Sequence, residues 1–174
     1  MPAIGDRAPA FELPDTGGGL HAPGGAPATV VVFTCNHCPY AVAWQDRLVA
    51  VARDYAPRGV RVLAICSNDA ERYPRDSPAA MAAAVAAGRF DGIPYLHDAT
   101  QRVARDYGAQ VTPDVFVLDA DGVLRYRGAP DGDHRDRSRD AAWLREALDA
   151  ILAGEAVRRP ETPPRGCSIK WRPD

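Results

Sequence analysis

Two cysteines separated by two residues are the positions at which this sequence is best suited to chemistry. They lie in Cys35-Asn36-His37-Cys38, after the apolar run at residues 30–33 and before an amphipathic stretch. A thiol at the start of a helix meets unpaired N–H groups and the positive end of the helix dipole. We therefore expect the pKa of Cys35 to lie below the free value of about 8.5. One helical turn separates the two sulfurs, so Cys35 can attack a disulfide and Cys38 can resolve the mixed disulfide.

The histidine between the two cysteines is expected to tune their acidity. His37 can carry a positive charge or donate a hydrogen bond close to either sulfur. Either interaction would stabilise the thiolate and lower the thiol pKa. The alternative is an unperturbed histidine on the surface.

A metal site is the alternative interpretation of the cysteine pair. Zinc would need two further ligands at suitable spacing, and the sequence has no second Cys-X-X-Cys and no His-X-His. The remaining histidines are isolated: His21, His97 and His134. Copper or zinc held by Cys35, Cys38 and a third thiol would make the protein a non-catalytic metal carrier or redox sensor. For a catalytic dithiol we expect neither a metal nor an organic cofactor, because electrons would pass through the sulfurs themselves.

Two further cysteines lie outside this motif. Cys66 ends an apolar run and is expected to be an inert core residue. Cys167 belongs to the apolar and aromatic segment at residues 166–171, within a tail that is otherwise rich in proline and arginine. Such a segment would gain free energy by docking. Docking beside Cys35 and Cys38 would make Cys167 a third redox thiol, and docking elsewhere would leave it a bystander.

Length and composition limit the classes of protein that remain. The chain has 174 residues, of which 46% are hydrophobic and 25% charged, which is typical of a single globular domain. A net charge of −2 gives no electrostatic reason to expect nucleic acid, and no run approaches the ~20 apolar residues of a membrane span. The first residues do not resemble a secretory signal, so we expect a cytoplasmic protein.

Alternating apolar runs and helical stripes predict an α/β fold. Buried strands are expected at residues 30–33 and 60–65, a helix between them, and further helices near 78–87, 99–107 and 144–151. Residues 115–118 and 123–126 form a predicted hairpin, and 11–13 and 20–22 predict short edge strands. The result is a central mixed β-sheet with helices on both faces, in a domain of residues 1–154. It carries an N-terminal β extension and a docked C-terminal tail of residues 155–174. Charged segments at 69–76 and 131–140 are expected to be solvated loops.

A threonine–proline pair precedes the predicted hairpin. Pro113 cannot donate to a sheet ladder, so it marks the start or edge of a strand, and the Thr112–Pro113 bond is of the kind that can be cis. A buried strand that leads into Cys-X-X-Cys, followed later by Thr-Pro, resembles the thioredoxin fold. The chain is similar to the redoxin (AhpC/TSA) branch and to bacterial peroxiredoxin-like proteins of the thioredoxin family. The segments that carry this resemblance are residues 4–13, 33–40, 95–98, 112–114 and 166–171.

The resemblance implies a thioredoxin-like fold and a thiol–disulfide oxidoreductase, with Thr112 and Pro113 shaping the groove that receives a partner. The expected partners are a protein or low-molecular-weight disulfide and a thiol reductant, and the expected state is a monomer or weak homodimer. A thiol peroxidase is the competing class. Peroxiredoxins carry a Pro-X-X-X-Thr-X-X-Cys pattern. When the cysteine of that pattern is aligned with Cys38, Cys35 stands in the place of the threonine. That departure favours disulfide exchange.

Overall fold

A five-stranded mixed sheet forms the centre of the molecule. In the computed structural model, which describes residues 1–174, the strand order is β5-β4-β3-β7-β8. The strands are β3 (Ala28–Phe33), β4 (Arg61–Cys66), β5 (Tyr95–His97), β7 (Asp114–Asp119) and β8 (Leu124–Gly128). The first three run parallel, and β7 and β8 are antiparallel to their neighbours. The predicted mixed sheet and its hairpin are therefore confirmed.

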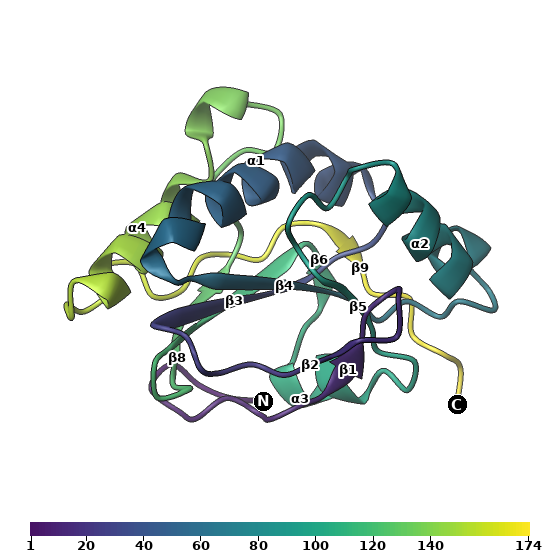
Figure 1. The fold of residues 1–174 in the computed structure, drawn as a ribbon, viewed down its shortest axis with the longest axis horizontal. Helices are drawn as coiled ribbons and strands as arrows, with labels where there is room; N and C mark the ends of the chain where they lie inside the picture. Colours follow the sequence, from purple (N-terminus) through teal and green to yellow (C-terminus); the bar gives the residue numbers. More distant parts are fainter.

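Helices cover both faces of this sheet (Figure 1). On one face lie α1 (Pro39–Tyr55), α2 (Pro78–Ala86) and α4 (Ala142–Leu152), and on the other lies α3 (Arg102–Tyr107). Side chains alternate along β3. Val30 and Val32 belong to the hydrophobic core on the face covered by α1, α2 and α4, and Val31 and Phe33 belong to the core on the α3 face. Burial on both faces explains the uninterrupted apolar run. None of the helices combines the length and the apolar character that a membrane span requires.

Local signals explain where the helices begin and end. Pro39 occupies the first turn of α1, where a missing N–H costs little. That helix gives way to a short 3₁₀ turn (Ala56–Arg58) closed by Gly59, whose φ of 82° suits glycine. Ser77 caps α2 by accepting a hydrogen bond from the Ala80 N–H at 3.1 Å.

The N-terminal segment adds a separate two-stranded sheet. Its strands β1 (Leu13–Pro14) and β2 (Leu20–His21) pair antiparallel. An isolated bridge between Asp15 and Leu96 joins this hairpin to the end of the central sheet.

The C-terminal tail lies across the domain and pairs with it. Thr162 is buried, and its hydroxyl accepts a hydrogen bond from the Ala129 N–H at 3.0 Å. Further on, β9 (Cys167–Ser168) pairs antiparallel with β6 (Val111–Thr112). Ile169 then inserts into the core on the α3 face. Figure 1 shows this yellow segment running beside the sheet to β6.

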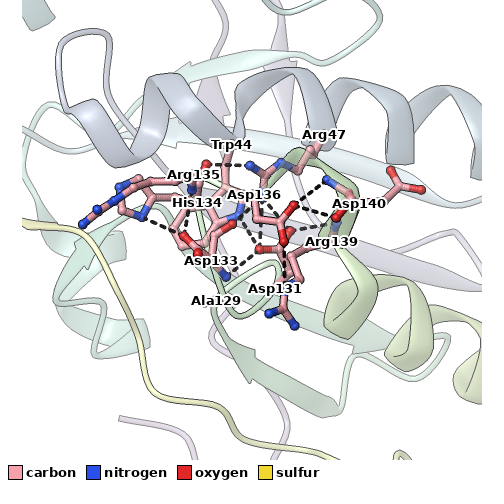
Figure 2. Close-up of polar contacts among 12 residues, drawn as sticks. Trp44, Arg47, Ala129, Asp131, Asp133, His134, Arg135, Asp136, Arg139 and Asp140 are labelled. Carbon is pink, nitrogen blue, oxygen red and sulfur yellow. Dashed lines mark hydrogen bonds and ion pairs between the residues drawn. The ribbon is translucent and has the colours of Figure 1, made fainter.

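The loop at residues 131–140 departs from the expectation of a solvated segment at its first residue, whereas the rest of it is partly or fully exposed. Asp131 is buried and pairs with Arg47 of α1 at 2.8 Å. The Trp44 indole N–H and the Ala141 backbone N–H also donate to its carboxylate, at 3.0 and 2.9 Å. Figure 2 shows Asp131 with Arg47 and Trp44 beneath α1. A buried charge needs such partners, so this ion pair holds the loop against the first half of α1.

Candidate active site

The two cysteines occupy the connection between β3 and α1, but the helix begins later than expected. Cys38 is the N-cap residue of α1, with Pro39 following it. Cys35 lies three residues earlier, at the end of the central strand. Cys35 was expected at or next to the cap of the helix and instead lies three residues before it, because Asn36 and His37 form a bend that precedes Cys38. The unpaired N–H groups of the helix therefore favour an anion at Cys38.

Both sulfurs contact Thr112. The Cys38 thiol, when protonated, donates to the Thr112 carbonyl oxygen at 3.2 Å, and the Cys35 Sγ lies 3.5 Å from the Thr112 hydroxyl. The peptide bond that follows, Thr112–Pro113, is cis. Residues that are far apart in the sequence thus meet at one point, the end of β3 against β6.

Each of the two thiols affects the pKa of the other. A hydrogen bond from the Cys35 thiol, together with the Ala41 N–H of the first helical turn, lowers the pKa of Cys38. The same contact with Cys38 raises the pKa of Cys35, and burial and the nearby carboxylate of Asp76 raise it further. This direction is opposite to the lowered pKa expected at Cys35.

Asp76 is the residue that sequence reasoning misplaced. It was expected in a solvated loop, yet it is fully buried beside the cysteine pair. Its carboxylate accepts hydrogen bonds from the Asn36 N–H and the Asn68 side-chain amide, each at 2.8 Å. One signal could have located it. Parallel strands β3 and β4 end at the same sheet edge, so the loops that follow them converge.

His37 is engaged with Asp76. Its Nδ1 lies 2.7 Å from the Asp76 carboxylate, and its ring is parallel to that of Tyr73 at 6.4 Å. The main causes of the pKa shifts of the two sulfurs lie elsewhere: in their mutual contact, in burial, in Thr112 and, for Cys35, in Asp76. The carboxylate of Asp76 thus acts on the pKa of Cys35 in the direction opposite to that expected of His37.

The same residues contain the one cluster with metal-ligand chemistry. Ligand atoms of Cys35, His37 and Asp76 lie within 4.8 Å of one another. Asp76 accepts a hydrogen bond at each carboxylate oxygen, from the Asn36 N–H and from the Asn68 amide. The third thiol, Cys167, is not part of this cluster.

The tail occupies the strand edge that was expected to face a partner. Thr112 pairs with Cys167 in the antiparallel register of β6 and β9. Gly166 approaches so closely that a Cβ there would lie 2.1 Å from the Thr112 carbonyl oxygen. The predicted groove at Thr112 and Pro113 is thus lined by this chain's own tail.

The remaining cysteines differ in their surroundings. Cys66 is fully buried, and desolvation raises its pKa to about 12, as expected of an inert core residue. Cys167 is partly exposed and packs against the core that contains Cys35 and Cys38. Desolvation and the contact with Cys38 raise the pKa of Cys167 to about 11.

Comparisons with known proteins agree with this architecture. The model of the AhpC/TSA family matches residues 4–127, which include Cys35, Cys38, Thr112 and Pro113. No curated protein matches the sequence. An uncharacterized conserved protein of Geobacillus kaustophilus is similar over 100% of this chain and 95% of its own, with 42% identity and a TM-score of 0.93. A hypothetical protein of Sinorhizobium meliloti 1021 is 40% identical over 100% of this chain and 97% of its own, with a TM-score of 0.91.

A third solved structure is more distant. It is a protein of Chlorobium tepidum described as a candidate thiol:disulfide interchange protein DsbE, 20% identical, with a TM-score of 0.68. It covers 86% of this chain and 98% of its own. At that identity the likeness concerns the fold alone, and that fold is thioredoxin-like, as the sequence predicted.

Proposed function

The chain belongs to the AhpC/TSA family, and on this basis we propose that it is a thiol–disulfide oxidoreductase whose working group is the Cys35–Cys38 dithiol. One observation carries the proposal. Both sulfurs contact Thr112, and Cys38 is the N-cap of α1, where a thiolate is stabilised.

The chemistry is a two-electron exchange. The reduced dithiol gives two electrons to a disulfide R–S–S–R′, so that the Cys35–Cys38 bond forms, the R–S–S–R′ bond breaks, and two thiols leave with the two protons. A thiol reductant then reduces the Cys35–Cys38 disulfide and restores the dithiol. The partners proposed are a protein or low-molecular-weight disulfide and a thiol. No organic cofactor takes part in this scheme.

The proposal is tested with single cysteine variants. Cys35→Ser and Cys38→Ser should each abolish the catalysed reduction of insulin by dithiothreitol. Cys66→Ser, in a fully buried residue outside the site, is the matched control and should retain the activity. Turnover that survives in both Cys35→Ser and Cys38→Ser would contradict the proposal.

A thiol peroxidase is the second candidate, and the position of Cys38 favours it. A cysteine with a lowered pKa at a helix N-terminus is suited to attack a peroxide. The absence of threonine at position 35 argues against it. Hydrogen peroxide and an alkyl hydroperoxide, assayed beside insulin, separate the two. A faster reaction with peroxide, with sulfenic acid trapped on Cys38 in Cys35→Ser, would favour the peroxidase.

A further inference from the structure

The reduced dithiol has little direct access to a partner. Cys35 is 3% exposed and Cys38 is 1% exposed. Thiol–disulfide exchange requires the attacking sulfur to approach along the line of the bond that breaks, so access limits its rate. A third sulfur, that of Cys167, is partly exposed and packs against the same core cluster.

The register of β6 and β9 places this third sulfur beside the other two. Thr112 and Cys167 are directly opposed in an antiparallel pair, so their side chains project from the same face. The Thr112 hydroxyl lies 3.5 Å from the Cys35 Sγ, which shows that this face is turned toward the dithiol. Cys167 therefore faces the dithiol too. Cys167 also packs against the core cluster that contains Cys35 and Cys38, which agrees with this placement.

The tail is held in this position by close backbone contact. Gly166 lies against the Thr112 carbonyl group, and Ile169 is 3% exposed in the core on the α3 face. On either side of Cys167 the chain is thus anchored, and Cys167 is held opposite Thr112.

We propose that Cys167 is a third redox-active thiol, through which electrons pass between the buried Cys35–Cys38 pair and thiols or disulfides in solution. This inference rests on the proposed function, and it adds the residue through which electrons reach the buried dithiol. In the oxidised protein, the Cys167 thiolate attacks Cys38 Sγ. The Cys38–Cys167 bond forms, the Cys35–Cys38 bond breaks, and Cys35 leaves as a thiolate that takes up a proton.

An external thiol completes the transfer. Its thiolate attacks the partly exposed Cys167 Sγ, and Cys38 leaves as the thiolate that the helix N-terminus stabilises. A second external thiol then attacks the mixed disulfide and releases Cys167 as a thiol. The sum is two external thiols oxidised to one disulfide, and Cys35–Cys38 reduced to a dithiol. Oxidation of the dithiol by an external disulfide follows the same steps in reverse.

The first experiment traps the intermediate. Cys35→Ser removes the competing sulfur, and oxidation with diamide should then link Cys38 to Cys167. Peptide mapping under non-reducing conditions identifies the link. A Cys38 that remains free, or that becomes linked only to added glutathione, would overturn the inference.

The second experiment measures the rate of transfer. Cys167→Ser should slow reduction of the oxidised dithiol by glutathione by about tenfold or more, because the buried bond must then be attacked directly. Ser168→Ala, the exposed neighbour on β9, is the matched control and should keep the wild-type rate. An unchanged rate in Cys167→Ser would contradict the relay.

These results also separate the inference from the proposed function. If wild-type protein forms the Cys35–Cys38 disulfide and reduces insulin while Cys167→Ser behaves identically, the relay is wrong and the dithiol activity stands. If wild-type protein forms no Cys35–Cys38 disulfide, the proposed function itself fails. Near-ultraviolet circular dichroism of Cys167→Ser verifies that its fold is retained.

Discussion

A buried carboxylate at the start of β7 should make the free energy of unfolding of this protein depend on pH. Asp114, the first residue of β7, is 1% exposed. One carboxylate oxygen accepts a hydrogen bond from the Gln110 N–H at 3.0 Å, and the other has no partner. Burial raises the pKa of Asp114 from 3.8 to about 6.

The magnitude follows from linkage. A folded pKa above the unfolded value means that the stabilising contribution is fully present below pH ~4 and is lost as pH rises through about 6. At 1.36 kcal/mol per pH unit, the difference between 3.8 and about 6 corresponds to about 3 kcal/mol. Asp114→Asn keeps an oxygen that can accept from Gln110 and removes the charge. The stability of the variant relative to wild type should therefore increase by about 2.4 kcal/mol between pH 4 and pH 8, because wild type has already lost part of the contribution at pH 4.

Urea unfolding followed by tryptophan fluorescence at both pH values measures this gain. The quantity compared is the free energy of unfolding of the variant minus that of wild type, so groups that titrate equally in both cancel. Asp121→Asn removes an exposed carboxylate from the turn of the same hairpin and serves as the control. If the gain for Asp114→Asn is no larger than that for Asp121→Asn, the assignment of a charged, buried Asp114 at neutral pH is wrong.

Three further perturbations test the surroundings of the site. Arg47→Met leaves Asp131 buried without its ion pair and should cost about 3–5 kcal/mol in urea unfolding, a change below about 1 kcal/mol being incompatible with the pair described. Gly166→Ala places a Cβ 2.1 Å from the Thr112 carbonyl oxygen. It should displace β9 from β6 and speed alkylation of Cys35 and Cys38 by iodoacetamide, whereas an unchanged rate would show that β9 does not shield them. Asp76→Asn removes one of the groups that raise the pKa of Cys35, behind Cys38 and burial. Its alkylation profile for Cys35 should move to lower pH, and a shift to higher pH would refute the electrostatic assignment.

Much of the fold could be read from local patterns. The apolar run at residues 30–33 predicts a central strand because each face of β3 contacts a separate core. Pro57 and Gly59 predict the end of α1, and Ser77 predicts the start of α2. These signals come from residues that are close to each other in the sequence, so they can be recognised without the structure.

The candidate site was predictable in its residue types and less so in its roles. Cys-X-X-Cys before a helix indicates a dithiol. Which cysteine caps α1 depends on the backbone between them, and there the Asn36 N–H donates a hydrogen bond to Asp76, 40 residues away. The same contact explains why Asp76, which looks like an ordinary loop carboxylate, is buried beside Cys35. Charge patterns alone do not reveal burial, because the partners of a buried charge come from other segments.

The sequence by itself therefore determined the order of strands and helices, the dithiol and the proline that follows Thr112, because these are set by periodicity and by near neighbours. Only the tertiary structure decided that Asp131 is buried against Arg47 and that Cys167 lies opposite Thr112. Both outcomes depend on contacts between segments more than 50 residues apart. Such contacts form only when the whole chain packs, and the burial and electrostatics they create leave no periodic trace in the sequence.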